Sequence, residues 1–244
     1  MRKTLEPTEK HKKRVAIFDI DGTIFRSSLL IELTEALIQD GIFKSSVSRV
    51  YAEAYRRWLD RSGPYEKYIA AVVRVYEKNI ACVDYGKFLE VAKKVVAFHH
   101  KRVYRYTRGL VKDLRRKNYY IVAISNSPRE IVEEFCRKIG FDKVYGRVYE
   151  VNRAKKFTGK ILYLNLISNK AKILRRAVQK RKLTLKGSIG VGDTESDIAF
   201  LKIVERPVCF NPNFRLYSHA KIHGWKIVVE RKDVVYEIGD GELL

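Results

Sequence analysis

Residues 14–23 have the sequence RVAIFDIDGT, a mostly apolar run that ends in two carboxylates and a glycine. The first five residues are short and apolar enough to form a strand buried on both faces. Asp19 to Thr23 has the composition of a turn. This stretch therefore predicts a buried strand that carries Asp19 and Asp21 at its carboxyl end.

Strand-like and helix-like segments alternate over the second half of the chain. The predicted strands are residues 119–124, 188–191, 206–210 and 225–229, with a hairpin of residues 144–151 and 160–164 around residues 152–159. The helices predicted between them include a basic helix at residues 169–182 and another near residues 214–223. This order is typical of an α/β protein with a doubly wound, mostly parallel sheet.

The helix after residues 119–124 has a strong start signal in the sequence. Ser127 is expected to be its N-cap, Pro128 its first residue and Glu130 the partner that closes a capping box. Gly140 is expected to end it. On this interpretation Ser127 caps a helix and has no catalytic role.

Residues 29–101 have a different texture, with apolar residues at helical spacing and no clear strand signal. Because this block lies inside the alternating pattern, we expect it to be an inserted, all-helical cap domain. The expected division is a core of residues 1–27 and 102–244 and a cap of residues 28–101.

A stripe of aromatic residues lies within the cap: Tyr51, Tyr55 and Trp58 recur at helical spacing. We expect this stripe to be a packing face of the cap, and a platform for the substrate is the alternative.

Composition restricts the class of protein. The chain has 244 residues, of which 46% are hydrophobic and 32% charged, as in a globular protein. No apolar run approaches the roughly 18 residues of a membrane span, and residues 1–14 are polar and basic, unlike a secretion signal. We therefore expect a cytoplasmic protein without a membrane partner. The three cysteines lie far apart without metal-ligand spacing, so we expect them to be reduced and buried.

The formal net charge of +22 has two interpretations. A basic surplus can indicate a nucleic acid or another polyanion as partner. The basic residues are spread along the whole chain, however, and aromatic residues accompany only the run at residues 103–106. This distribution favours a solvated surface, with the polyanion partner as the alternative.

Polar groups follow several of the predicted strands, where ligands bind in open α/β sheets. These groups are Asp19 and Asp21, Ser125 and Asn126, Asp193 and Asp197, together with Lys170 at the start of the basic helix. Carboxylate oxygens suit a hard cation such as Mg²⁺, and hydroxyl and ammonium groups suit phosphate. A carboxylate can attack phosphorus to form an acyl phosphate, and a second carboxyl can protonate the leaving alkoxide.

The same residues resemble four motifs of the haloacid dehalogenase superfamily. Asp19-Ile-Asp-Gly-Thr23 is similar to the first motif, Ser125 to the second, Lys170 to the third and Gly192-Asp193-x-x-x-Asp197 to the fourth. The helical insert resembles the cap of the phosphoserine-phosphatase-like subgroup, and residues 149–161 resemble its small hairpin. The resemblance covers essentially the whole chain and implies a Rossmann-like core.

The resemblance also implies a role for each residue. Asp19 would be the nucleophile and a Mg²⁺ ligand, and Asp21 would be the general acid/base and a ligand through its carbonyl. Asp193 would be a further ligand, with Thr23 and Asp197 as supporting residues. The phosphate-binding groups would be Ser125, Asn126 and Lys170. Lys172 is an alternative to Lys170, and Asp197 can also cap Thr194. His219 and His223 lack a third ligand and are expected at the surface.

The substrate is less defined by the sequence. Phosphoserine phosphatases typically place a glutamate where Ser28 stands, which disfavours phosphoserine; Glu32 and Arg56 are further candidate contacts from the cap. The function expected is hydrolysis of a small phosphorylated metabolite. A phosphatase or phosphotransferase for a larger anion such as a nucleic-acid end, and a non-catalytic basic binding protein, are the alternatives. The acidic cluster argues against the last, since a scaffold has no need of it.

Overall fold

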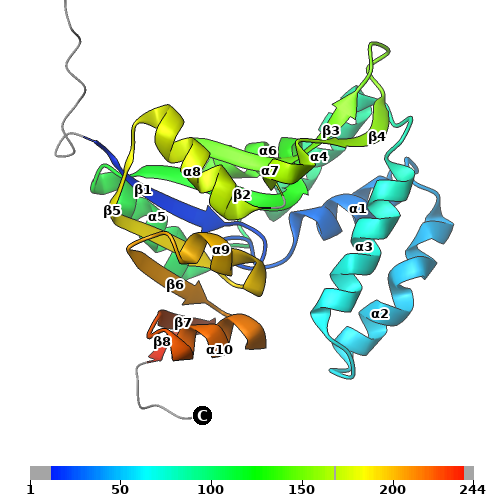
Figure 1. The fold of residues 1–244 in the computed structure, drawn as a ribbon. Coiled ribbons are helices and arrows are strands. Elements are labelled where there is room, and N and C mark those ends of the chain that lie inside the picture. The colour runs from blue at the N-terminus through cyan, green and yellow to red at the C-terminus, as the bar shows by residue number, and fades with distance from the viewer. Residues whose placement is uncertain (1–11, 168, 239–244) are drawn as a thin grey trace, which may run out of the picture.

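The computed structural model describes residues 12–167 and 169–238, and the expectations for residues 1–11 lie outside this part of the chain. An eight-stranded sheet forms its centre, in the order β4-β3-β2-β1-β5-β6-β7-β8 (Figure 1). The strands are β1 (Arg14–Asp19), β2 (Tyr120–Pro128), β3 (Lys143–Val151), β4 (Phe157–Leu162), β5 (Thr184–Gly192), β6 (Arg206–Phe210), β7 (Lys226–Arg231) and β8 (Val234–Ile238). Six strands from β3 to β7 pair in parallel, and β4 and β8 are antiparallel edge strands.

The first strand occupies the middle of the sheet because it is apolar on both faces. Val15 to Phe18 are fully buried. Parallel pairing sets Asp19 opposite Ile124 of β2 and Phe18 opposite Val191 of β5. The carboxyl ends of β1, β2 and β5 therefore lie next to one another.

Helices cover both faces of the sheet. Ala16 and Phe18 pack in one apolar cluster, with residues of α5 (Arg105–Arg116) and α6 (Arg129–Ile139). Val15 and Ile17 point to the other face and pack in a second cluster, with residues of α7 (Leu164–Ile167), α8 (Lys170–Arg181), α9 (Ile198–Leu201) and α10 (Phe214–Ile222). This alternation along one strand is the reason why the sheet is wound on both sides, as the sequence predicts.

The helical block lies between β1 and β2 in the chain, as expected. It consists of α1 (Leu29–Gln39), α2 (Arg49–Leu59), α3 (Tyr65–Asn79) and α4 (Tyr85–His99), with the short 3-10 helix η2 (Ser45–Ser48) before α2. In Figure 1, α2 and α3 lie side by side beyond the end of the sheet, and α4 lies near α6. The apolar cluster on the α5 and α6 face continues into these helices, so cap and core share packed side chains.

The β3–β4 hairpin contacts the loop that joins α3 to α4. The amide of Cys82 donates to the carbonyl of Phe157 at 2.8 Å, and the amide of Phe157 donates to the carbonyl of Val83 at 3.0 Å. A third bond runs from the amide of Tyr85 to the carbonyl of Lys155. The hairpin thus fixes one end of α3 through backbone bonds.

Several expectations on local structure are wrong. The hairpin's second strand begins at Phe157, three residues before the expected start, because its first residues pair with the α3–α4 loop. β8 was not expected, although four of its five residues are β-branched or aromatic and favour a strand. Cys82 is exposed, because it lies in that same loop, whereas Cys136 and Cys209 are buried as expected; all three are free. In the described part of the chain, no helix is both long and apolar enough to span a bilayer.

Candidate active site

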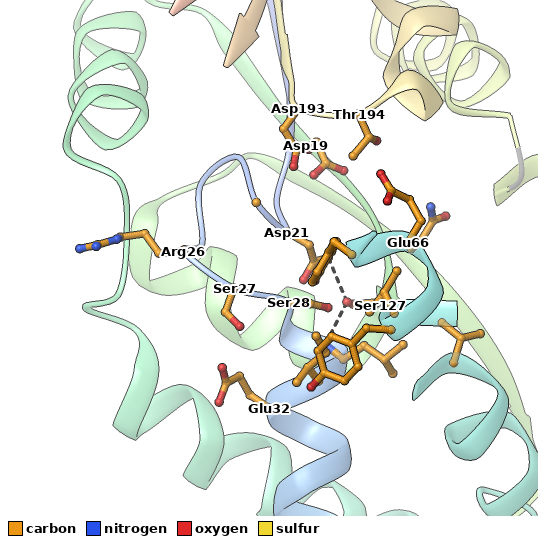
Figure 2. Close-up of a pocket in the computed structure, with 18 of the residues that line it drawn as sticks. Asp19, Asp21, Arg26, Ser27, Ser28, Glu32, Glu66, Ser127, Asp193 and Thr194 are labelled. Carbon is orange, nitrogen blue, oxygen red and sulfur yellow. Dashed lines mark hydrogen bonds between the residues drawn. The ribbon is translucent and has the colours of Figure 1, made fainter. Parts of the chain in front are cut away.

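A pocket of about 760 Å³ lies between the carboxyl end of the sheet and the cap helices. Asp19, Asp193 and Lys170 line its floor, and side chains of α1, α2 and α3 line its other side. Figure 2 shows Asp19 and Asp193 close together at one end, with Asp21 turned toward Ser127. Five of the expected residues therefore line one crevice: Asp19, Asp21, Asn126, Lys170 and Asp193. Three others are fully buried and do not line it: Thr23, Ser125 and Asp197.

Lys170 lies between two buried carboxylates. Its Nζ is 2.5 Å from Oδ1 of Asp19 and 2.5 Å from Oδ1 of Asp197. The side chain of Asn169 caps α8 by accepting from the amide of Lys172, which directs Lys170 into the protein as the first helical residue. Lys170 is 5% exposed, whereas Lys172 lies on the exposed side of the helix. The geometry thus favours Lys170 over Lys172 as the lysine of the pocket.

Asp197 joins the end of β5 to this lysine. Its Oδ2 accepts from the amides of Asp193 and Thr194 at 3.0 and 3.1 Å, and it closes a capping box with Thr194 at the start of the 3-10 helix η3 (Glu195–Asp197). The other oxygen contacts Lys170. Asp197 therefore closes the capping box and contacts Lys170 at the same time.

Asp193 faces the turn that follows β1. Its Oδ1 accepts from the hydroxyl of Thr23 at 3.1 Å. Gly22 passes close to it with φ of +82°, and a Cβ on that residue would lie 2.1 Å from Oδ2 of Asp193. Glycine is required here both by the left-handed backbone and by the close approach of the carboxylate.

The carboxylates fit a divalent cation. Asp19, Asp193 and Asp197 each have an oxygen within 4.8 Å of the others. With Lys170 as their ammonium partner, the four groups have a formal charge of −2 when ionised, in a site that is largely buried. Hard oxygen ligands and an excess of buried negative charge are what Mg²⁺ binds.

The pKa values reflect the same excess of negative charge. Burial raises the pKa of Asp19 to about 8; Lys170 lowers it, and Asp197 and Asp21 raise it. Burial, with Asp19 and Asp197, also raises the pKa of Asp193 well above its usual range. Burial acts to lower the pKa of Lys170, but the coulombic attraction of Asp19 and Asp197 raises it overall, so the lysine stays charged.

The carboxyl group of Asp21 turns away from the other three. Its Oδ1 accepts from the amide of Leu29 at 2.5 Å, at the start of α1. Its Oδ2 accepts from Ser125 Oγ at 2.5 Å and from Ser127 Oγ at 2.9 Å. Burial raises the pKa of Asp21, against the lowering effect of these donors. Asp21 is thus a separately held carboxyl at the wall of the pocket.

The expectation that Ser127 is a helix N-cap is wrong. Strand β2 runs on to Pro128, α6 begins at Arg129, and the helix has no side-chain cap. The Ser127 hydroxyl instead donates to Asp21 and accepts from the amide of Leu30. The sequence did not reveal this contact, because Ser127 and Glu130 have the spacing of a capping box and a helix cap accounted for the serine. Gly140, with φ of +92°, does end α6 as expected.

The residues expected to contact the substrate from the cap differ in position. Ser28 is buried and lines the pocket, and Asn126 is exposed and also lines it. Glu32 lines the pocket too, but its oxygens lie 2.9 Å from Nη1 of Arg102 and 3.2 Å from Nε2 of His99. Arg56 is exposed and forms an ion pair with Glu53 along the surface of α2. It is not among the described residues that line the pocket.

The aromatic stripe of α2 has two functions rather than one. Tyr51 is buried and donates to Glu35 at 2.6 Å, which is the packing role expected. Tyr55 and Trp58 are 39% and 38% exposed and line the pocket. Two residues of α3, Tyr65 and Tyr68, line it with them. All three residues lie on one face of α2, and only Tyr51, a turn nearer the start of the helix, is covered, which the sequence pattern alone did not show.

Cap and core also meet at the open side of the pocket. The side-chain amide of Asn213, just before α10, donates to Glu66 of α3 at 3.2 Å and to Glu195 of η3 at 2.5 Å. These are side-chain contacts, in contrast to the backbone bonds at the other end of α3.

Comparison with known proteins agrees with this architecture. The sequence pattern of the haloacid dehalogenase-like hydrolases matches residues 16–202, so the chain belongs to this family. Among curated relatives, an "inhibition of morphological differentiation protein" of Streptomyces azureus is 24% identical over 92% of this chain and 82% of its own length. A histidinol-phosphatase of Neisseria meningitidis is 23% identical, over 88% of this chain and 98% of its own length.

Solved structures share the fold at lower identity. A protein of unknown function from Bordetella pertussis superposes with a TM-score of 0.71 at 16% identity, covering 88% of this chain and 98% of its own. A phosphoserine phosphatase with a phospho-aspartyl intermediate analogue gives a TM-score of 0.60 at 19% identity, covering 91% and 95%. These likenesses support the fold, including the helices inserted after the first strand.

Proposed function

We propose that the protein is a Mg²⁺-dependent phosphatase that hydrolyses small phosphate monoesters through an aspartyl phosphate on Asp19. The observation that carries the proposal is a largely buried cluster of charged groups from three separate segments: Asp19, Asp193, Asp197 and Lys170. When ionised, the cluster has more negative than positive charge. Phosphatases among the curated relatives, including the histidinol-phosphatase, support the reaction class.

In the first half-reaction, a carboxylate oxygen of Asp19 attacks phosphorus and the bond from phosphorus to the alcohol oxygen breaks. Asp21 donates its proton to the departing oxygen, so a neutral alcohol leaves. In the second half-reaction, Asp21 takes a proton from water, the water oxygen attacks phosphorus, and the bond to Asp19 breaks. Inorganic phosphate leaves and Asp19 is regenerated.

The surrounding groups hold the reactants. Lys170 would donate to the oxygens of the phosphoryl group, whose negative charge the ammonium offsets. The Ser125 hydroxyl donates to Asp21 in this structure and would have to turn to reach the same oxygens. Asp19 and Asp193, with the carbonyl of Asp21, would hold Mg²⁺, which supplies positive charge near the phosphoryl oxygens. The apolar cap side chains exclude water from the pocket.

The test is phosphate release from p-nitrophenyl phosphate by the wild type and by Asp19→Asn, with Mg²⁺ and with EDTA. We expect Mg²⁺-dependent release by the wild type and a loss of at least about a thousandfold in the variant, since the nucleophile is removed. Asp113→Asn, an exposed residue of α5 paired with Arg116, is the matched control and retains activity. Unchanged release by Asp19→Asn would contradict the assignment of the nucleophile.

A second readout detects the intermediate. Acid quenching of the wild type during turnover of a ³²P-labelled ester should leave label on the protein, and hydroxylamine should remove it, because acyl phosphates are cleaved by this nucleophile. Asp19→Asn should carry no label. Label that resists hydroxylamine would point to another nucleophile.

A further inference from the structure

The pocket is larger and more apolar than a phosphate group requires. A volume of about 760 Å³ lies in the range of sites that enclose a whole small molecule. The side away from the carboxylates is formed by cap side chains that share an apolar or aromatic character: Leu30, Ile31, Tyr55, Trp58, Tyr65, Tyr68, Ile69 and Val73. The organic part of a substrate bound at Asp19 would lie against this side.

Four rings of this set form one connected group, which we call the aromatic wall: Tyr55, Trp58, Tyr65 and Tyr68. Trp58 and Tyr68 are nearly parallel, with an interplanar angle of 17° and centroids 5.6 Å apart. Tyr55 lies 5.1 Å from Tyr68, and Tyr65 lies 5.5 Å from Trp58. These separations are those of favourable aromatic pairs, so each ring fixes the orientation of the next.

The wall is only partly used for packing. Tyr68 is 4% exposed and serves as its buried base. Tyr55 and Trp58 keep more than a third of their surface exposed, at 39% and 38%, although they line a pocket. Large rings held in place with exposed area inside a cavity offer a surface for another flat group.

The wall also lies near the reacting groups. Burial raises the pKa of Tyr65, and the charges of Asp21 and Asp193 raise it further. Tyr65 also lines the same pocket as both carboxyl groups. A group attached to a phosphate at Asp19 by a short linker can contact it.

The pocket is less suited to an amino group. Both oxygens of Glu32 are paired, with Arg102 and His99, and Glu35 accepts from Tyr51. Where a glutamate might bind an ammonium, at position 28, the chain has a serine. Glu66, the third cap glutamate that lines the pocket, accepts from Asn213. Recognition by stacking is therefore better provided for than recognition of a positive charge.

We propose that the site, taken as the phosphatase site described above, selects phosphate monoesters whose alcohol carries a flat aromatic ring, and that Tyr55 and Trp58 stack on this ring. The aromatic wall thus determines specificity, and the carboxylates and Lys170 perform the reaction.

The test compares three esters of primary alcohols: ethyl phosphate, 2-phenylethyl phosphate and 2-cyclohexylethyl phosphate. The last two have rings of similar size on the same linker, and one of them is flat. We expect kcat/KM for the phenyl ester to exceed that for both other esters by about tenfold or more, as for stacking on an aromatic side chain. Equal values for the phenyl and cyclohexyl esters would overturn the proposal, since the pocket would then select apolar size alone.

Variants locate the effect on the wall. Trp58→Leu should lower the ratio of kcat/KM between the phenyl and ethyl esters toward one, and Trp58→Phe should restore much of it, because a ring is retained. Tyr236→Leu removes a half-exposed aromatic residue on β8, outside the pocket, and should leave the ratio as in the wild type. An unchanged ratio in Trp58→Leu would contradict the role of this residue.

Inhibition gives a measurement that does not depend on the leaving group. 2-Phenylethylphosphonate should inhibit hydrolysis of p-nitrophenyl phosphate about tenfold more strongly than ethylphosphonate, and Trp58→Leu should remove this difference. Absence of Mg²⁺-dependent release from every ester would instead refute the proposed function. Release without preference for the flat ring refutes only the specificity, so the two failures are distinguishable.

Discussion

Single residues decide how the two carboxyl groups of the proposed mechanism are kept apart. Asp19 lies with Lys170, whereas Asp21 is held two residues later by Leu29, Ser125 and Ser127. The turn at Gly22 makes this possible, because the chain reverses within a few residues after the strand. In the proposed mechanism, one short stretch thus supplies the nucleophile and a proton donor that is held by a separate set of partners.

Ser127→Ala tests whether this hydroxyl positions Asp21. The variant removes one of the three donors to the carboxyl group. Because a hydrogen bond to a charged group contributes about 1.5–3 kcal/mol, we expect kcat to fall about tenfold or more with little change in KM. Steady-state kinetics with p-nitrophenyl phosphate would measure it. Ser48→Ala, which removes an exposed hydroxyl bound to the carbonyl of Ser45, should have wild-type kinetics. An unchanged kcat in Ser127→Ala would remove the residue from the mechanism.

Gly22→Ala tests the close approach to Asp193. The backbone strain of a positive φ costs about 1–2 kcal/mol, and the added Cβ must also displace the carboxylate. Gly41 is a matched control, since it has φ of +70° with nothing within 4 Å of its Cβ position. We expect both alanine variants to lose similar stability in urea titrations, and only Gly22→Ala to need more Mg²⁺ for half-maximal activity. The same Mg²⁺ requirement in both variants would contradict this role for Gly22.

At the scale of elements, two glycines indicate how tightly the helices lie on the sheet. Gly146 of β3 faces the start of α6, and a Cβ there would lie 2.5 Å from the Cα of Arg129. For Gly109 of α5, no atom lies within 4 Å of the position that a Cβ would take. The first is a close backbone contact that fixes the start of α6 against β3, and the second is an ordinary helical position.

The two glycines should respond to alanine with opposite signs. Gly146→Ala should lower the free energy of unfolding by about 1–3 kcal/mol, because backbone must move. Gly109→Ala should raise it by about 0.5–1 kcal/mol, because alanine has the higher helix propensity. Midpoints of urea unfolding at constant slope would measure both. A stabilising effect of Gly146→Ala would mean that β3 and α6 are less closely packed than described.

The elements show which parts of the molecule the sequence can predict. The strand at Arg14–Asp19 was predictable because its residues are apolar on both faces, and the basic helix at Lys170–Arg181 because Asn169 caps it. Ser127 was assigned wrongly because its hydroxyl is used across 106 residues of sequence, by Asp21, and not by its own helix. The roles assigned to the site residues and the domain boundaries stay predictions.

The whole molecule carries a large positive charge, yet its central site has an excess of negative charge. The basic residues are spread along the chain, and the proposed reaction does not require a nucleic-acid partner. A cation bound among Asp19, Asp193 and Asp197 would offset repulsion that the folded chain otherwise bears.

Mg²⁺ should therefore stabilise the fold. At a concentration a hundred times its Kd, binding contributes about 2.7 kcal/mol, which raises Tm by about 5–10 °C for a chain of this size. Differential scanning calorimetry with MgCl₂, against NaCl at equal ionic strength, would measure the shift. Asp193→Asn should lose most of the shift and, in EDTA, be at least as stable as the wild type, because one buried charge is removed. A full shift in that variant would place the ion elsewhere.

The two ends of α3 are attached to the core in different ways. The loop after its last residue is bonded to the β3–β4 hairpin through backbone groups, which a change of side-chain rotamer does not break. At its start, Glu66 is joined to Asn213 by one side-chain hydrogen bond. We therefore expect α3 to pivot about its last residues when the bond between Glu66 and Asn213 breaks. Alcohol and phosphate should leave through the gap that opens beside Glu66, so the rate of product release should depend on a contact between a residue of the pocket lining and a residue whose amide bonds to the carbonyl of Asp193.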